Sequence, residues 1–291
     1  MTSSPPSIAE LRAVCQPPEL VLRRSAEHWA GRLYMRRLSL HVTRRVLALP
    51  ITPNGWTAMM VGVGVGAAIV LAVPGVATAV AAAVGVQVYL LLDCVDGEIA
   101  RWRRSTSAAG AYLDRLGHYA VEAALLIGLG VRADGGPGAI GSATALGLVA
   151  AVLALLGKAE TDLVTVARAA AGLPTTAEPD PTSRVATLRG ARRLFAFVPV
   201  HRVIGAVELS LLSVSAAVVD TATGSLVGSR TLVVATVTIG AVVALGHPIM
   251  ILTSQRLRDT ASDSGATMPG GEDRRKANAG HSTGRTEALD R

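Results

Sequence analysis

The sequence is poor in charge, in aromatic residues and in cysteine, and each shortage narrows the class of protein. Only 17% of the 291 residues are charged and 3% are aromatic, whereas 50% are hydrophobic. So little charge does not fit an ordinary soluble domain. With few aromatic residues to stack on bases, a nucleic-acid-binding function is not favoured, although the formal net charge is +7. The two cysteines, Cys15 and Cys94, lie in unrelated surroundings and exclude a disulfide framework.

The hydrophobic residues gather in long blocks, and the mean hydropathy of the chain is +0.44. A helix that crosses the hydrocarbon core of a bilayer needs about 20 consecutive apolar residues. Six blocks approach that length, which predicts an all-α integral membrane protein with six transmembrane helices. The blocks cover roughly residues 55–73, 76–96, 109–131, 138–158, 203–223 and 231–253.

The basic residues predict the orientation of these spans. Of 28 lysines and arginines, only Arg132 and Arg230 fall in the loops expected outside, and Arg115 falls within the third block. Because cytoplasmic loops carry an excess of basic residues, both termini and the 97–108 loop are expected in the cytoplasm. We therefore expect a protein of the plasma (cytoplasmic) membrane, with its active site on the cytoplasmic side. The basic residues are interrupted by spans, which is a further argument against a nucleic-acid partner.

The rest of the chain divides by composition. Residues 1–18 are polar and contain proline, which predicts a loose N-terminal tail. Residues 19–50 mix apolar residues with arginine pairs, typical of an amphipathic juxtamembrane helix on an anionic lipid surface. A charged tail that merely fixes the topology is the alternative. Turn and capping residues in "ITPNG" (Ile51–Gly55) then open a six-span domain at 51–253, and residues 254–291 predict a disordered cytoplasmic tail.

The segment "GVGVGA" (Gly62–Ala67) matches the letters of the dinucleotide-binding fingerprint. It follows no predicted strand and lies inside an apolar span, so this interpretation fails on context. Gly62 and Gly66 are instead typical of a small-residue face on which transmembrane helices pack.

One stretch concentrates ionisable residues, "LLLDCVDGEIARWRRSTSAAGAYLDRLGHYAVEA" at Leu90–Ala123. Asp93 and Asp96 share a helix face at the end of the second span, and Asp114 and His118 share one on the third. Ionisable groups at membrane depth are costly and usually face an interior cavity. A helix hairpin can therefore direct the three aspartates at one point, where carboxylates without thiolates predict Mg²⁺ or Mn²⁺. Salt bridges that stabilise the hairpin are the alternative interpretation.

This stretch resembles the motif of the CDP-alcohol phosphatidyltransferase family, D-x-x-D-G-x-x-A-R, eight residues, G-x-x-x-D-x-x-x-D. The six spans, the predicted N-terminal helix and "TPN" before the first span extend the resemblance over roughly residues 20–255. Seven of the eight defined positions match: Asp93, Asp96, Gly97, Ala100, Arg101, Gly110 and Asp114.

The resemblance implies an enzyme in which an acceptor hydroxyl attacks the β-phosphorus of a CDP-alcohol, releases CMP and forms a phosphodiester. It implies a homodimer whose partners are a CDP-alcohol donor, an alcohol acceptor and membrane lipids. The three aspartates would be metal ligands. The CDP pocket would be lined by Gly97, Ala100, Arg101 and Gly110.

His118 stands where the motif has its fourth aspartate. It is expected to act as a general base, to bind a second metal such as Mn²⁺, or to mark lost activity. In the last case the chain is a catalytically silent relative that binds a nucleotide or a partner. Glu122, one turn further, is expected either to orient the imidazole or to pair with a neighbouring span.

The acceptor side has weaker signals. Candidates for binding an acceptor phosphate, as in family members that use inositol phosphate, are Lys158, Arg192, Arg193 and Arg202. Ordinary positive-inside charge is the alternative explanation. The donor is expected to be CDP-diacylglycerol entering from the bilayer or a soluble CDP-alcohol such as CDP-inositol. A transporter is disfavoured because the ionisable residues cluster at one face.

Overall fold

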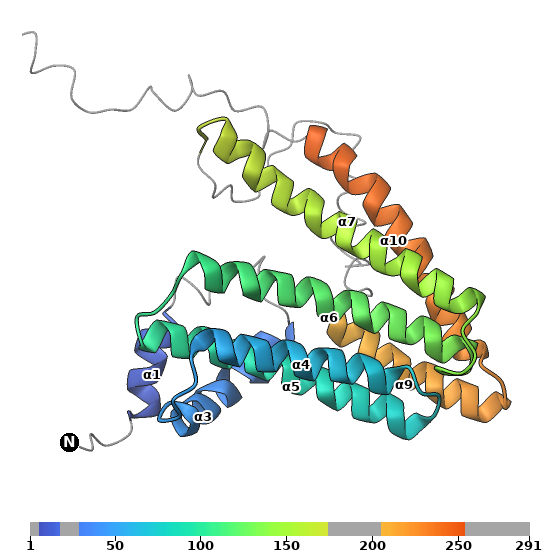
Figure 1. The fold of residues 1–291 in the computed structure, drawn as a ribbon, viewed down its shortest axis with the longest axis horizontal. Coiled ribbons are helices and arrows are strands. Elements are labelled where there is room, and N and C mark those ends of the chain that lie inside the picture. Colours follow the sequence, from blue (N-terminus) through green and yellow to red (C-terminus); the bar gives the residue numbers. More distant parts are fainter. Residues whose placement is uncertain (1–5, 18–28, 174–204, 254–291) are drawn as a thin grey trace, which may run out of the picture. The chain divides into compact units, whose positions relative to one another are not determined.

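A computed structural model describes residues 6–17, 29–173 and 205–253, and its regular elements in these ranges are helices (Figure 1). In chain order they are α1 (Ile8–Cys15), the π-helical turn η1 (Gly31–Met35), α3 (Arg36–Val46), α4 (Pro53–Leu71), α5 (Val76–Trp102), α6 (Ala108–Asp134), α7 (Ser142–Ala170), α9 (Ala206–Thr223) and α10 (Val227–Thr253).

Six of these helices are long and apolar enough to cross a membrane, namely α4, α5, α6, α7, α9 and α10. Large apolar side chains project from their outer faces. Ile69 is 66% exposed, Val152 64% and Leu245 73%. Apolar surface of this kind suits contact with lipid, where helices satisfy their own backbone hydrogen bonds. The predicted all-α integral membrane fold with six spans is confirmed.

Local capping sets where the spans begin. The Thr52 side chain accepts a hydrogen bond from the Gly55 amide at 3.1 Å, so the capping predicted from "ITPNG" is confirmed. Ser107 caps α6 in the same way, with 3.0 Å to the Gly110 amide. Helices α5 and α7 extend furthest beyond the C-terminal ends that hydropathy predicted. Helix α5 continues beyond residue 96 to Trp102, and α7 continues beyond residue 158 to Ala170.

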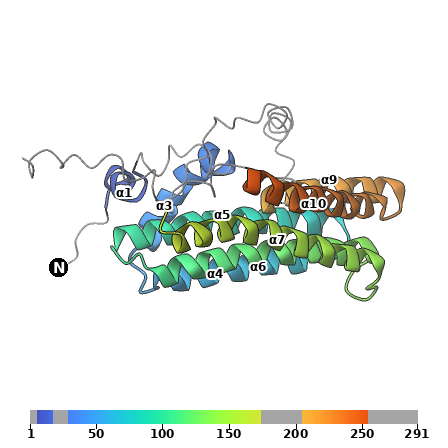
Figure 2. The same cartoon turned by 90° about the horizontal axis from the view of Figure 1, so that it is seen from above.

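Helices α4, α5, α6 and α9 run side by side, with α4 against both α5 and α6, and α9 against α5 and α6 (Figures 1 and 2). Several glycines permit this packing, and Gly64 is the one that faces both α5 and α6 near the site. A Cβ atom there would lie 2.6 Å from the Val121 side chain on α6 and 3.0 Å from the Tyr89 ring on α5. Gly62 and Gly66 do not form the predicted packing face against the described residues of this chain, because Cβ atoms at these positions would meet none of them within 4 Å.

Arg132 is part of the protein interior and not of an outer loop. It lies in the last turn of α6 with 1% of its surface exposed. Its guanidinium donates to the carbonyls of Val73 and Gly75, both at 2.8 Å. Arg230 likewise lies within α10, and its Nε donates to the Ala133 carbonyl at 3.1 Å. Backbone carbonyls near the helix ends thus accept from both guanidinium groups, which holds Arg132 in the interior, whereas Arg230 stays exposed.

The N-terminal region differs from its prediction. Part of the expected loose tail is α1, which begins with a capping box between Ser7 and Glu10 and buries Leu11 and Cys15. The described part of the expected amphipathic helix is η1 and α3, and their lying on a membrane surface stays a prediction. The tail at 254–291 is outside the described residues.

The chain forms two compact units. The first comprises Met1–Glu160 with Val185–Pro248, and the second comprises Thr161–Arg184 with Ile249–Arg291. All the side chains of the site described below belong to the first unit.

Candidate active site

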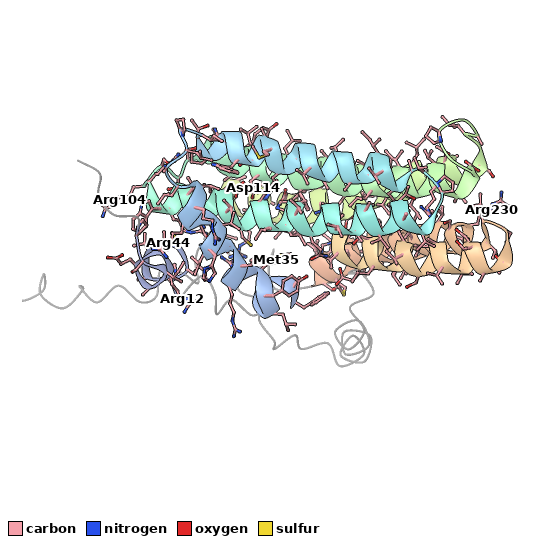
Figure 3. The ribbon with its side chains drawn as sticks, turned by 90° about the horizontal axis from the view of Figure 1, so that it is seen from below. Arg12, Met35, Arg44, Arg104, Asp114 and Arg230 are labelled. Atoms are coloured by element: carbon pink, nitrogen blue, oxygen red, sulfur yellow. The ribbon has the colours of Figure 1, made fainter. Side chains whose placement is uncertain are left out.

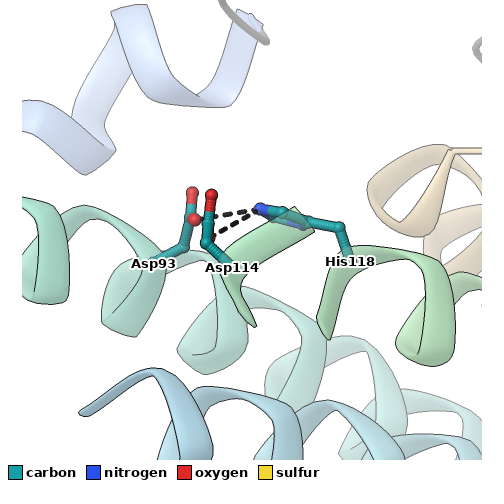
Figure 4. A group of neighbouring side chains, drawn as sticks. All are labelled: Asp93, Asp114 and His118. Carbon is teal, nitrogen blue, oxygen red and sulfur yellow. Dashed lines mark hydrogen bonds and ion pairs between the residues drawn. The ribbon is translucent and has the colours of Figure 1, made fainter. Parts of the chain in front are cut away.

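The hairpin of α5 and α6 brings Asp93, Asp114 and His118 together, as Figure 4 shows. One ligand atom from each lies within 4.8 Å of the other two. The Nε2 atom of His118 is 3.0 Å from Oδ1 of Asp93 and 3.5 Å from Oδ1 of Asp114. Figure 3 shows Asp114 nearer to the end of the bundle marked by Arg104 than to the end marked by Arg230. The predicted convergence of aspartates is therefore found for Asp93 of α5 and Asp114 of α6.

The electrostatics of this group suit a cation. Oδ1 of Asp114 is buried, makes no hydrogen bond with the described residues and lies 3.5 Å from Nε2 of His118. A buried carboxylate oxygen that lacks a hydrogen bond is costly, and a bound cation reduces that cost. The side chains of Asp93 and His118 are 31% and 27% exposed, so the group is partly open to solvent.

Asp96 lies one turn beyond Asp93 but is outside this group. Its side chain is 6% exposed, and its Oδ2 accepts a hydrogen bond from the Thr57 hydroxyl of α4 at 2.7 Å. The structure therefore ties Asp96 to α4, and its role as a metal ligand stays a prediction.

Of the residues expected to line the CDP pocket, Gly97, Ala100 and Arg101 lie on α5, which extends to Trp102, and Gly110 lies in the first turn of α6. Nε of Arg101 donates to the Cys15 carbonyl at 2.7 Å. Its guanidinium lies over Gly97, where a Cβ would approach Nη1 at 3.2 Å. At Gly110, a Cβ would approach the Asn54 side-chain oxygen at 3.3 Å. Gly97 and Gly110 thus each leave room for a polar side chain. Ala100 is partly buried on α5.

Glu98 is a buried carboxylate that the sequence analysis did not single out. It is fully buried on α5 and accepts hydrogen bonds from Gln16 at 2.7 Å, Ser39 at 2.5 Å and Thr43 at 2.6 Å. Ser39 and Thr43 are four residues apart on α3, so they share a face, and that spacing could have indicated a partner. Glu98 thereby holds the N-terminal segment, here Gln16 and helix α3, against α5.

Tyr89 was also missed. It lies on α5, four residues before Asp93, and its hydroxyl is hydrogen-bonded to Nδ1 of His118. The i, i+4 spacing from Asp93 places it on the same helix face and was the available signal.

Glu122 pairs with Lys158 of α7, whose Nζ is 3.0 Å from its Oε1. This contact corresponds to the second of the two expectations for Glu122. The Lys158 ammonium also lies 5.1 Å from the centroid of the Tyr119 ring. The other candidates for the acceptor phosphate, Arg192, Arg193 and Arg202, lie outside the described residues.

Comparison with known proteins identifies the region that contains the site. The profile of the CDP-alcohol phosphatidyltransferase family matches residues 50–253, which is most of the chain and all six spans. No curated protein matches the sequence. The chain belongs to the CDP-alcohol phosphatidyltransferase family, as its motif indicated.

Proposed function

We propose that this member of the CDP-alcohol phosphatidyltransferase family is a metal-dependent phosphotransferase of phospholipid or related phosphodiester synthesis. The observation that carries the proposal is the group of Asp93, Asp114 and His118, inside the region that the family profile matches. In it, a buried Asp114 oxygen makes no hydrogen bond with the described residues. The group supports chemistry on a diphosphate because carboxylates that hold a divalent cation commonly bind it together with substrate phosphate.

The side chains present fit such a cation. Asp93 and Asp114 offer carboxylate oxygens to Mg²⁺ or Mn²⁺, and we include Asp96 from the motif. An imidazole nitrogen close by is tolerated better by Mn²⁺ than by Mg²⁺. When bound, the cation supplies positive charge that polarises the diphosphate and stabilises the charge that develops on its oxygens.

His118 is proposed to accept the proton of the acceptor hydroxyl at Nε2, the nitrogen that faces both carboxylates. The hydroxyl oxygen then forms a bond to the β-phosphorus of the CDP-alcohol. The bond between that phosphorus and the oxygen bridging to CMP breaks, and CMP leaves. A neutral imidazole suits this step because it can take and return a proton near neutral pH.

The donor is proposed to lie along α5 and the start of α6. Arg101 can pair with its phosphates because, among the described residues, its guanidinium donates from Nε to the Cys15 carbonyl, and the Nη atoms remain as donors. Gly97, Ala100 and Gly110 allow the nucleotide to approach the helices closely. CDP-diacylglycerol can reach such a site from the bilayer. A soluble CDP-alcohol is the other donor class to test.

On the acceptor side, Lys158 is proposed to contact the acceptor, with its charge partly balanced by Glu122. A phosphorylated acceptor would compete with Glu122 for the ammonium. Location in the plasma membrane with a cytoplasmic active site, and assembly as a homodimer, complete the proposal. They follow from the distribution of basic residues and from the family.

The test is turnover by purified protein in lipid with Mg²⁺ or Mn²⁺, across a panel of CDP-alcohols and acceptors. An acceptor labelled with ¹⁸O in its hydroxyl should yield a phosphodiester that retains the label, together with one CMP per product. Asp114→Ala should abolish both products. If the protein binds CDP and Mn²⁺ but forms no product across the panel, the chain is a silent relative and the proposal fails.

A further inference from the structure

The imidazole of His118 is held at both of its nitrogens. Nε2 faces the partly exposed Asp93 at 3.0 Å, and Nδ1 is hydrogen-bonded to the hydroxyl of Tyr89. Tyr89 is 1% exposed, and its ring meets the imidazole edge-on, with centroids 5.6 Å apart and planes at 79°. His118 therefore lies between a buried tyrosine and an open pair of carboxylates.

The chemistry of these partners assigns the hydrogens. An ionised carboxylate only accepts, so the contact with Asp93 requires a hydrogen on Nε2. Nδ1 of the neutral ring then has a lone pair, which accepts from the Tyr89 hydroxyl. If Nε2 is to receive a proton, the ring must first adopt the other tautomer, with its hydrogen on Nδ1. A tyrosine oxygen can accept from that hydrogen, so Tyr89 can partner His118 in either tautomer and in the protonated ring.

The surroundings fix Tyr89 in place. Its ring belongs to the buried apolar core, and Gly64 of α4 leaves the space in which it lies. A Cβ atom on Gly64 would approach Cδ2 of the ring at 3.0 Å. A close-packed ring has little freedom to turn, so its hydroxyl stays directed at His118.

We propose that Tyr89 is a positioning residue for His118, whose hydroxyl keeps the imidazole turned with Nε2 toward Asp93 and Asp114. The kinetic consequence rests on the proposed function. The positioning of the ring does not, and it can be measured without turnover.

The first experiment observes the ring in the metal-free protein. Full-length chain labelled with ¹⁵N-histidine gives ring nitrogen signals from six histidines, and the His118 signals are those lost in His118→Ala. Tyr89→Phe removes the hydroxyl and keeps the ring. It should shift the Nδ1 signal and broaden or split the Nε2 signal as the imidazole loses its fixed orientation. Tyr112→Phe is the matched control, because Tyr112 is 65% exposed and lies on α6.

The second experiment separates positioning from cation binding. Tyr89→Phe should lower kcat by about 10- to 100-fold, the usual cost of removing a hydrogen-bond partner behind a functional imidazole. KM for the CDP-alcohol and Kd for Mn²⁺, measured by EPR without substrate, should stay within about 3-fold of the wild type, because the carboxylates are untouched. Unchanged thermal unfolding establishes that the variant is folded.

Three results would overturn the proposal. Unchanged His118 signals in Tyr89→Phe would show that the hydroxyl does not orient the ring. An unchanged kcat would show that orientation does not matter to the reaction. A Kd for Mn²⁺ that weakens in parallel with kcat would assign Tyr89 to the cation site instead. If the wild type releases no CMP, the proposed function fails by itself, and the ¹⁵N signals still decide whether Tyr89 orients His118.

Discussion

His118 and Asp93 are in direct contact, with Nε2 of the imidazole 3.0 Å from Oδ1 of the carboxylate. His118 stands where the motif has its fourth aspartate, and from α6 it contacts Asp93, the motif's first aspartate, on α5. At the sequence position of the motif's fourth aspartate, this chain offers an imidazole nitrogen instead of carboxylate oxygens. The substitution therefore changes the donor chemistry of the group while leaving the group assembled.

A carboxylate in place of His118, the proposed base, would add an oxygen donor beside Asp93 and Asp114 and should change the preferred cation. His118→Asp should retain CMP release and shift the ratio of Mg²⁺-supported to Mn²⁺-supported activity toward Mg²⁺, because oxygen donors suit the harder ion. Initial rates at saturating concentrations of each ion give this ratio. A ratio that is identical in wild type and variant would mean that residue 118 does not sense the cation.

Gly64, and not its neighbours Gly62 and Gly66, should be sensitive to size. Gly64→Val should destabilise the protein by about 1–3 kcal/mol, because its Cβ would lie 2.6 Å from the Val121 side chain. Gly62→Val is the matched control, since a Cβ there meets nothing within 4 Å. Thermal unfolding in detergent compares them, and equal losses of stability would contradict the packing described.

Glu98 should anchor the N-terminal segment. Glu98→Gln removes the charge from a buried group that accepts from three side chains, which should cost about 1.5–3 kcal/mol of stability. The loss should appear as faster proteolysis within the first 50 residues. Glu10→Gln, at an exposed carboxylate, is the control. Equal protease resistance in wild type and Glu98→Gln would show that Glu98 does not hold the N-terminal segment in place.

Cys15 should be unreactive in the folded protein. Burial, and next the negative charge of Glu98, raise the pKa of its thiol from 9.0 to about 11. A raised pKa keeps the thiol protonated, and alkylation needs the thiolate. In a Cys94→Ser background, iodoacetamide at pH 8 should react about 100-fold more slowly with folded than with denatured protein, a tenfold factor for each of two pKa units. The rate should keep rising above pH 9.

Glu98→Gln should accelerate this alkylation, because it removes the neighbouring negative charge that contributes to the raised pKa. A folded-state rate equal to the denatured rate would contradict the burial of Cys15.

The sequence predicted features that depend on local spacing. Hydropathy located six spans, capping residues located the start of α4, and spacing within the motif placed Asp93 and Asp114 at one point. Hydropathy predicted that the second span ends at residue 96, whereas α5 continues to Trp102. The polar end of this helix is stabilised by contacts with the N-terminal residues. There Arg101 donates to the Cys15 carbonyl, and Glu98 is satisfied by the N-terminal segment.

Contacts between distant parts of the chain were not predictable in this way. Tyr89 and His118 are 29 positions apart, and Glu98 and Gln16 are 82 apart. A periodicity gives the face of a helix on which a residue lies but not the element that packs there. Arg132 was assigned to a loop for the same reason, because the carbonyls that receive it come from the connection between α4 and α5.

The most direct test of the account is CMP release by the wild type, Asp114→Ala and His118→Ala, assayed together in the same lipid with saturating Mn²⁺. We expect wild-type release with a CDP-alcohol and an acceptor, loss of release in Asp114→Ala, and a rate at least about 100-fold lower in His118→Ala, as for loss of a general base. Release by His118→Ala at the wild-type rate would contradict the role of the histidine. Release by Asp114→Ala at that rate would contradict the site itself.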